Sequence, residues 1–162
     1  MIVAAFAALF TLLAFSAALV HGDASHDGWP ETVTYKSHPD DQNGVLRGTR
    51  RSDELLGGHG NDTIYGRGAA DVIWGDFKPC CQPSSQHDRL FGGRGNDFIY
   101  ASHGRNEIHA GAGNDTIHAH YGARGGSIDC GSGNDILFVS HKRKSHYGIG
   151  NCERLTYRHE GK

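Results

Sequence analysis

Hydrophobic residues recur at every ninth position along the middle of the chain. Residues 48–138 divide into nine units, two of them lengthened by insertions, and regular examples are GGHGNDTIY (57–65), GGRGNDFIY (92–100) and AGAGNDTIH (110–118). The eighth position of every unit is Leu or Ile: Leu55, Ile64, Ile73, Leu90, Ile99, Ile108, Ile117, Ile128 and Leu137. A fixed period sustained over so long a stretch indicates a repeat architecture.

Each unit divides into a turn and a strand. Glycines in the first six positions permit the positive φ angles and close backbone approach that a tight turn needs. The last three positions predict a short strand, with position eight pointing inward and positions seven and nine outward. We therefore expect a stack of short strands whose core is the column of Leu and Ile side chains.

The sixth position of the units is predominantly acidic: Asp53, Asp62, Asp71, Asp88, Asp97, Asn106, Asp115, Gly126 and Asp135. Glycines followed by Asp and then Leu or Ile resemble the nonapeptide of RTX, or haemolysin-type, calcium-binding repeats over residues 48–138. The tail DCGSGND…NCERL (129–155) is similar to the end of secreted bacterial members of that family. The resemblance implies an all-β fold, a right-handed parallel β-roll (a β-solenoid) of about nine nonapeptide units, with two units to each coil.

In such a roll, alternate turns fall on two edges. The first edge carries an unbroken row of five acids: Asp53, Asp71, Asp97, Asp115 and Asp135. The second edge carries Asp62, Asp88, Asn106 and Gly126, and it receives both insertions. Neighbouring coils lie about 4.8 Å apart, so close pairs of carboxylates repel one another by about 1–4 kcal/mol. Calcium prefers six to eight oxygen ligands and suits the row on the first edge.

The resemblance also implies which residues hold calcium, through carbonyl oxygens at positions one to four and the Asp side chains. One site is expected from Gly93, Gly95, Asp97, Ala110, Ala112 and Asp115, and the next from Gly111, Gly113, Asp115, Cys130, Ser132 and Asp135. Earlier sites, between Asp53, Asp71 and Asp97, depart from the pattern because Arg51 and Ala69 replace glycine. On the second edge we expect binding only near Asp62 and Asp88. The alternative is a glycine-rich solenoid that binds no metal.

The two outer faces of the roll are expected to differ in polarity. Position nine reads Leu56, Trp74, Tyr100, His118 and Phe138 on one face, and Tyr65, Phe91, His109 and Asp129 on the other. The first set is too apolar to be left in water. Either the N-terminal segment or the C-terminal cap covers it, or a partner protein or cell-surface glycan docks there on Trp74, Tyr100 and Phe138.

Segments of different character flank the repeats. Residues 1–20 are apolar except for Thr11 and Ser16, which predicts a signal peptide over residues 1–24 or, alternatively, a retained membrane anchor. Residues 25–47 are expected to be an irregular N-terminal segment, residues 77–87 a surface loop, and residues 139–162 a basic C-terminal cap. Membrane contact is expected only if residues 1–20 are retained, and localisation is expected to be extracellular.

Four cysteines fit an oxidising compartment and allow three disulfide pairings. A Cys130–Cys152 bond is the favoured pairing, because it pins the C-terminal cap onto the last coil. Cys80 and Cys81 form either a vicinal disulfide or bonds elsewhere. None of the four stands in a paired CxxC pattern typical of zinc sites.

Composition and motifs narrow the function classes further. The net charge of −2 gives no basis for a nucleic-acid partner, and none is expected. The basic run HKRK (141–144) fits a solvated loop or a contact with acidic glycans. The chain has no HExxH, GxSxG or GxxxxGK[ST] motif, and we expect no enzyme.

The favoured hypothesis is an extracellular roll that folds on several calcium ions and has a structural or adhesive role. The alternative is a secreted polysaccharide-binding module, or an accessory module of a hydrolase or epimerase.

Overall fold

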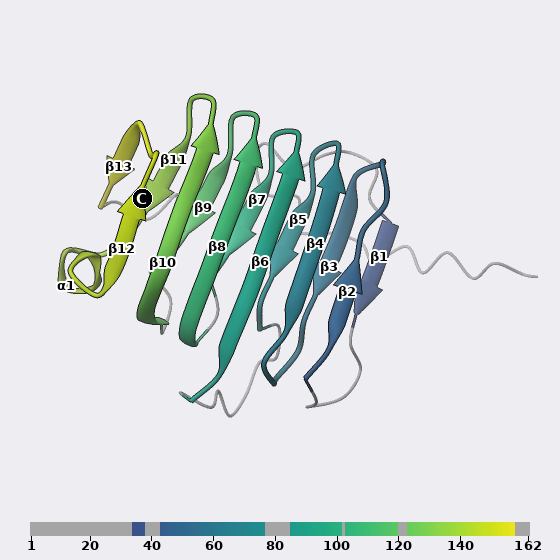
Figure 1. Cartoon of the computed structure of the whole chain (residues 1–162), viewed down its shortest axis with the longest axis horizontal. Helices are drawn as coiled ribbons and strands as arrows, with labels where there is room; N and C mark the ends of the chain where they lie inside the picture. The colour runs from purple at the N-terminus through teal and green to yellow at the C-terminus, as the bar shows by residue number, and fades with distance from the viewer. Residues whose placement is uncertain (1–33, 38–42, 77–84, 102, 120–122, 158–162) are drawn as a thin grey trace, which may run out of the picture.

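The computed structural model describes residues 34–37, 43–76, 85–101, 103–119 and 123–157 as two parallel sheets wound from one chain (Figure 1). Sheet A consists of β1 (Thr34–Ser37), β3 (Asp53–Leu56), β5 (Val72–Trp74), β7 (Phe98–Tyr100), β9 (Thr116–His118), β11 (Ile136–Phe138) and β13 (Arg154–Thr156), in that order. Sheet B consists of β2 (Val45–Arg47), β4 (Thr63–Gly68), β6 (His87–Arg94), β8 (Gly104–Ala112), β10 (Ala123–Ser132) and β12 (Tyr147–Gly150). One short helix, α1 (His141–Lys144), precedes β12.

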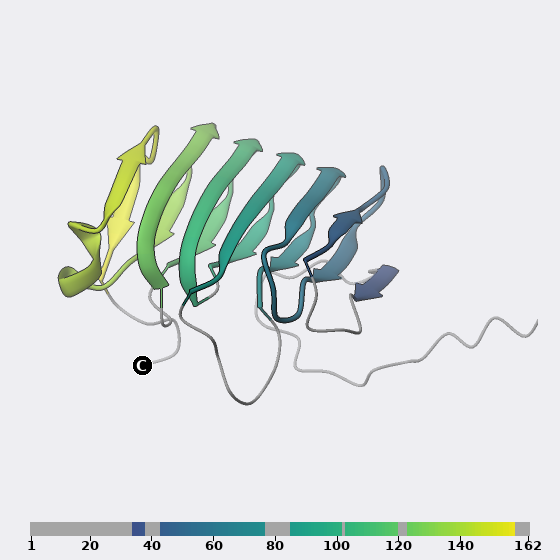
Figure 2. The same ribbon diagram turned by 60° about the horizontal axis from the view of Figure 1, so that its bottom comes forward.

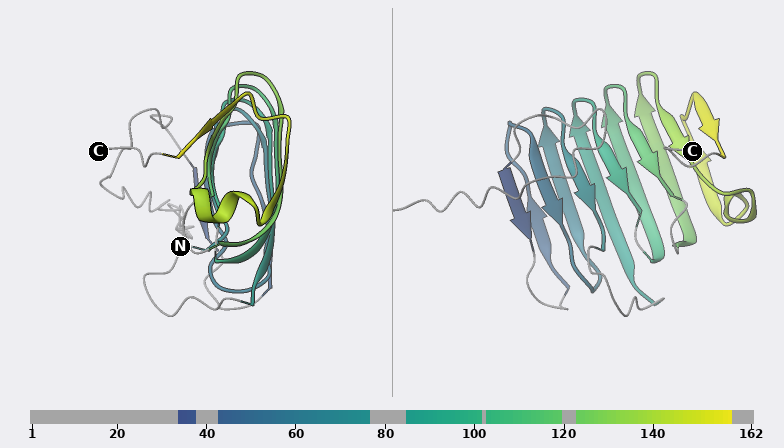
Figure 3. Two further views of the ribbon diagram at one scale, coloured as in Figure 1. Left: turned by 90° about the vertical axis from the view of Figure 1, so that its left-hand side faces the viewer. Right: turned by 180° about the vertical axis from the view of Figure 1, so that it is seen from behind.

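Strands alternate between the two sheets along the chain, and every pairing between neighbours is parallel. Seen along the stack, the coils superimpose as a flattened ring, with one sheet on each side (Figure 3, left). The predicted parallel β-roll is therefore confirmed. Among the described residues, no helix is long and apolar enough to cross a membrane.

The core is the predicted column of Leu and Ile at position eight. Eight of these nine side chains are fully buried, and Ile128 is 1 % exposed. Within each sheet they lie in register, as in the pairs Ile73↔Ile99 and Ile108↔Ile128. A single column of branched side chains from each sheet fills the narrow interior, so the roll needs no larger core.

Strand length differs between the two sheets. Strands β5, β7, β9 and β11 of sheet A have the three residues expected. On sheet B, however, β6, β8 and β10 have eight, nine and ten residues. These strands run on through the first three positions of the next unit, where Gly93 pairs with Gly111 and Gly111 with Gly131. Glycines at these positions bring successive backbones close enough to continue the ladder into the turn.

The roll also continues on both sides of residues 48–138. Before them, β2 pairs with β4 and β1 pairs with β3. After them, β12 pairs with β10 and β13 with β11, in the register Leu137↔Leu155. Residues 148–156 thus form a further unit, GIGNCERLT, with Glu153 at position six and Leu155 at position eight. The run HKRK, expected as a loop, forms α1 beside β12 at this end (Figure 2).

Position nine of sheet A forms a ladder of stacked rings. Ring centroids are 3.8 Å apart for Trp74–Tyr100, 4.6 Å for Tyr100–His118 and 4.7 Å for His118–Phe138. Tyr100 is 5 % exposed and Phe138 9 % exposed. Two of the three residues expected to meet a glycan or protein partner are therefore buried. Strand β1 joins the sheet at its edge, and residues 25–33, which were expected to help cover this face, lie outside the described residues.

Candidate metal sites

A ladder of carboxylates runs along the first edge of the roll, which is the upper edge in Figure 1. From Asp71 onward, each carboxylate accepts the backbone N–H of the corresponding aspartate one coil earlier. Donor–acceptor distances are 2.7 Å from Asp53 to Asp71, 2.9 Å from Asp71 to Asp97, 2.8 Å from Asp97 to Asp115 and 2.8 Å from Asp115 to Asp135. All five aspartates are at most 1 % exposed. The predicted row of acids on the first edge is thus continuous and buried.

Only one oxygen of each of these carboxylates takes part in the ladder. In Asp97, Asp115 and Asp135 the Oδ2 atom is buried and has no hydrogen-bond partner among the described residues. A buried carboxylate oxygen without a donor costs free energy unless a cation or proton meets it. The ladder therefore holds a row of anionic oxygens that need a positive partner.

Burial and mutual repulsion raise the pKa values of Asp97 and Asp115. Burial, together with the charges of Asp115 and Asp71, raises the pKa of Asp97 to about 8. Burial and the charge of Asp135 raise the pKa of Asp115 to about 6. Each group still accepts a backbone N–H, which favours the charged form but only partly offsets the loss of water.

Backbone carbonyls face the same space between consecutive turns. A Cβ atom at Gly111 would collide with the carbonyl oxygen of Gly93, and one at Gly113 with that of Gly95, so both oxygens point forward to the next turn. Carbonyls of the later turn also face back toward the earlier one. A Cβ atom at Gly92 would collide with the Ala110 carbonyl oxygen and with Asp97 Oδ2, so these two oxygens lie close together. The same forward arrangement recurs from Gly111 and Gly113 to Gly131 and Gly133. Carbonyls and a carboxylate therefore converge between turns 92–97 and 110–115.

The turns depend on glycine at positions two and four. Gly93 and Gly95 have φ angles of 113° and 127°, and Gly111 and Gly113 have 118° and 140°. L side chains rarely adopt these angles. The carbonyl oxygen at position three instead accepts a backbone hydrogen bond from the previous turn of the same edge. Ala112 O accepts the Gly95 N–H at 2.8 Å, and Ser132 O accepts the Gly113 N–H at 3.0 Å. Cys130, whose carbonyl was expected to bind calcium, lies at position one of the turn 130–135.

The turn 66–71 of the first edge keeps this geometry without glycine at positions two and four, and the carbonyls of Arg67 and Ala69 face Gly93 and Gly95 in the same way. Arg67 and Ala69 take positive φ angles of 84° and 72°, so the turn keeps its shape although its side chains are unfavourable there. In the turn before it, Asp53 Oδ2 already accepts hydrogen bonds from Thr49 N at 2.6 Å and Thr49 Oγ1 at 2.9 Å. The carboxylate of Asp53 is therefore partly satisfied within its own turn.

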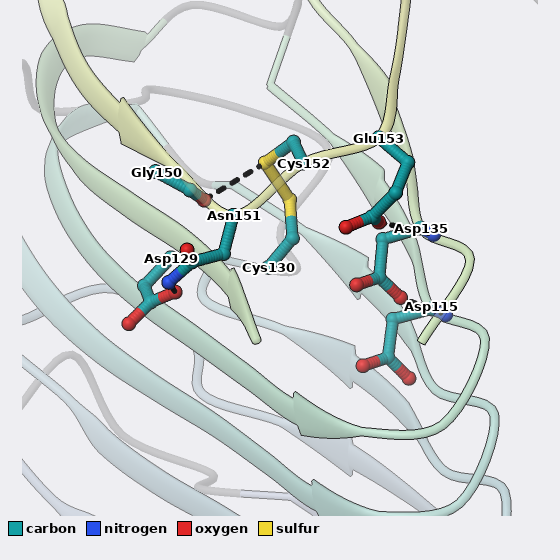
Figure 4. Close-up of a disulfide and its surroundings, with 8 residues drawn as sticks. All are labelled: Asp115, Asp129, Cys130, Asp135, Gly150, Asn151, Cys152 and Glu153. Carbon is teal, nitrogen blue, oxygen red and sulfur yellow. Dashed lines mark hydrogen bonds between the residues drawn. A yellow bond between two sulfur atoms is a disulfide. The ribbon is translucent and has the colours of Figure 1, made fainter. Parts of the chain in front are cut away.

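Two features of the edge were missed in the sequence. Glu153 extends the ladder by one coil, since its Oε2 accepts the Asp135 N–H at 2.9 Å (Figure 4). The signal was the spacing of 18 residues that separates both Asp135 from Glu153 and Leu137 from Leu155. Position five forms a second ladder, in which Asn114 N donates to Asn96 Oδ1 at 2.9 Å and Asn134 N donates to Asn114 Oδ1 at 3.0 Å. Its signal was the recurrent GND triplet.

The second edge carries a shorter acidic ladder. Gly44 N donates to Asp62 Oδ1 and Asp62 N donates to Asp88 Oδ1, both at 2.8 Å. Burial and the charge of Asp88 raise the pKa values of both Asp62 and Asp76 to about 7. Asp76, which accepts the His103 N–H at 3.0 Å, was not predicted and comes from the lengthened unit.

The disulfide predicted between Cys130 and Cys152 is present, with Cα atoms 5.1 Å apart (Figure 4). It joins β10 to the final unit beside the carboxylates of Asp135 and Glu153. Cys80 and Cys81 lie outside the described residues.

The chemistry of the donors distinguishes between kinds of metal. Among the described residues, no group of three or more His, Cys, Asp or Glu side chains is placed to hold an ion. Any site on the first edge must therefore combine carboxylates with backbone carbonyls. All these donors are hard oxygens, which suit calcium better than zinc or copper. The fold and its edge define a class of protein, the parallel β-roll with oxygen-lined turns for a hard cation.

Comparison with known families agrees with this class. The RTX calcium-binding nonapeptide repeat matches the chain in four copies, over residues 43–77 and 84–117. These residues are RTX calcium-binding repeats, and the match supports a calcium-binding β-roll. No curated protein and no solved structure matches the chain.

Proposed function

We propose that this protein is an extracellular β-roll that folds when it binds several calcium ions along its first edge, and that it has a structural or adhesive role. The observation that carries the proposal is the row of buried Oδ2 atoms without donors on Asp97, Asp115 and Asp135. Binding calcium compensates these charges, so the free energy of binding becomes free energy of folding.

We assign two of the proposed sites to the turns of the first edge. The first combines Asp97 and Asp115 with carbonyls of residues 93, 95 and 110, and the second combines Asp115 and Asp135 with carbonyls of residues 111, 113 and 130. The carbonyls of residues 112 and 132 are left out, because they accept the N–H groups of Gly95 and Gly113. A further site between Asp135 and Glu153 extends the row into the last unit. On the second edge, Asp62 and Asp88 supply the carboxylates. Outside the cell, millimolar calcium would keep such sites filled, whereas a site of this affinity would be largely empty in the cytoplasm.

A non-enzymatic role agrees with how the described residues are used. Their acidic side chains on the first edge serve the ladder, and their apolar side chains serve the core and the stacked rings. A roll of this kind is a stiff spacer whose folding is switched on by external calcium. We propose that secretion through an N-terminal signal delivers it to that environment.

The test is a calcium titration of the full chain followed by far-UV circular dichroism. We expect little β structure without calcium and a cooperative gain at about 0.1–1 mM calcium, as for extracellular modules. A chain with equal β structure in excess chelator contradicts the proposal.

Replacing Asp115 with Asn should raise the calcium midpoint most, because this residue belongs to two sites. We expect a rise of about tenfold or more, since a hydrogen bond or ion contact to a charged group contributes about 1.5–3 kcal/mol. Glu107→Gln is the matched control. That carboxylate pairs with Arg89 at 2.9 Å on the exposed face of sheet B, where an ion pair contributes at most about 1 kcal/mol. Equal midpoints for the two variants would place calcium elsewhere.

A further inference from the structure

An open pocket of about 520 Å³ lies on the second edge, toward the C-terminal end of the roll. It is lined by Ser85, Gln86, Arg105, Arg124, Gly126 and His146. None of these residues belongs to the carboxylate ladders or to the proposed calcium sites. Three of the six lining residues are basic.

The coils bring these residues together from four successive turns. Arg105 pairs with His87 on β6 and with Gly125 on β10. Arg124 stands at the register shift between Ala123 and Gly125, where one extra residue is accommodated. The carbonyl of His146 accepts the Gly126 N–H at 3.2 Å. Because coils lie about 4.8 Å apart, the three basic residues lie along one short stretch of the edge.

The aspartates of the second edge are absent from the two coils that carry the arginines of this pocket. In a second-edge turn nearer the N-terminus, position five is Asn61 and position six is Asp62. In these two coils, the corresponding residues are Arg105 and Asn106, and then Gly125 and Gly126. The acids that would neutralise the arginines are therefore replaced. Asp88, one coil earlier, is fully buried and accepts the Asp62 N–H.

The charges of the pocket are not satisfied within the described part of the chain. Neither Arg105 nor Arg124 makes an ion pair or side-chain hydrogen bond with another described residue, and both are exposed to solvent. Gln86 is only 6 % exposed, and its side chain is hydrogen-bonded to the carboxylate of Asp76. The pocket thus presents two guanidinium groups and an imidazole, all of them able to donate.

We propose that this pocket binds an oxyanion group, the carboxylate, sulfate or phosphate shared by acidic saccharides and free inorganic anions. Arginine suits such a ligand because its planar fork donates two parallel hydrogen bonds to one oxyanion. Arg105 and Arg124 hold the anion from neighbouring coils, with His146 as a further donor. The pocket exists only in the folded roll, because its residues come from separate coils.

The test is isothermal titration of the full chain, folded in saturating calcium, with sulfate at constant ionic strength. We expect saturable binding that weakens by about tenfold in Arg105→Gln and in Arg124→Gln, since each loses a charge-assisted bond. Arg94→Gln, an exposed arginine on the first edge, is the matched control and should bind like the parent. Circular dichroism in calcium confirms that each variant is folded.

Galactose 6-sulfate and galactose separate the two sources of the anion. Tighter binding of galactose 6-sulfate than of sulfate identifies a saccharide-borne group, and equal binding identifies a free anion; galactose itself should not bind. The proposal is overturned if sulfate does not bind the folded chain, or if it binds both pocket variants as tightly as Arg94→Gln.

Discussion

At the scale of single residues, each position of the nonapeptide has its own physical task. The residues at positions two and four adopt positive φ angles, the residue at position six provides a buried carboxylate, and the residue at position eight provides a core side chain. Position five adds a ladder that runs opposite to the carboxylates. Asn114 donates its N–H to the coil before it, whereas Asp97 donates its N–H to the coil after it. Each pair of adjacent turns is thereby tied in both directions.

Gly113→Ala tests the requirement for glycine. At φ 140°, a Cβ atom would collide with the Gly95 carbonyl, so we expect a loss of about 1–3 kcal/mol in the free energy of unfolding and weaker calcium binding. Gly150→Ala is the control, because a Cβ there meets nothing within 4 Å. Urea unfolding in calcium measures both variants. Equal stability of the two would refute the assigned role of position four.

The pH dependence of the calcium-free chain tests the buried carboxylates. The pKa values of Asp97 and Asp115 rise from 3.8 to about 8 and about 6. The folded state therefore binds more protons than the unfolded chain. The stability from these groups is complete below about pH 4 and is lost as the pH rises toward 8. Circular dichroism without calcium should show more β structure at pH 5 than at pH 8, and Asp97→Asn should reduce the difference. More β structure at pH 8 would contradict this assignment.

At the scale of elements, the two ends of the roll are built differently. At the N-terminal end, β1 and β2 add strands to sheets A and B. At the C-terminal end, α1, the final nonapeptide unit and the disulfide close the stack together. Among the described strands, β13 ends sheet A and β12 ends sheet B, and an end strand is a site for aggregation unless it is held or covered. The Cys130–Cys152 bond holds the last unit against β10 and so protects this end.

Removing this disulfide should destabilise the roll in calcium. Its cysteines are separated by 22 residues, for which the loop-entropy model gives about 3 kcal/mol. We expect a Cys130→Ala/Cys152→Ala variant to unfold at lower urea than the parent, and a reducing agent to have little further effect on it. An unchanged urea midpoint would show that the last unit is held by its strand pairings alone.

At the scale of the whole molecule, the roll is a one-dimensional stack in which each coil contacts mainly its neighbours. Stability in such proteins is roughly a sum of unit and interface terms. The first-edge turns 92–97, 110–115 and 130–135 have glycine at both positions that need positive φ, whereas Arg67 and Ala69 take those angles at a cost. The C-terminal coils should therefore bind calcium first.

Hydrogen exchange at subsaturating calcium measures that order. Amides of β7 to β11 should become protected at lower calcium than amides of β3 to β5, because local stability follows the number of well-formed sites. Arg67→Gly/Ala69→Gly should narrow the gap. Simultaneous protection of all coils would show that the stack folds as one cooperative unit.

Much of this architecture was determined by the sequence alone, because a nonapeptide repeat is local information. The period and the core column follow from residue spacing. The assignment of Asp53, Asp71, Asp97, Asp115 and Asp135 to one edge follows from the resemblance to RTX repeats, and the disulfide was favoured because it pins the C-terminal cap onto the last coil. The ladders were not visible in this way, because a hydrogen bond from Asp97 to Asp115 depends on how coils stack. The same holds for Glu153, which acts as a sixth carboxylate only because β13 pairs with β11.

Tertiary structure also decided which side chains on the outer faces are buried and which residues lie together on the second edge. The sequence identified an apolar row at position nine, but only the fold showed that Tyr100, His118 and Phe138 are buried in one stack. It likewise brought Arg105, Arg124 and His146 into one pocket. These residues are far apart in the chain and follow no shared motif. Their proximity arises from the pitch of the coil, which the spacing of glycines and aspartates sets only indirectly.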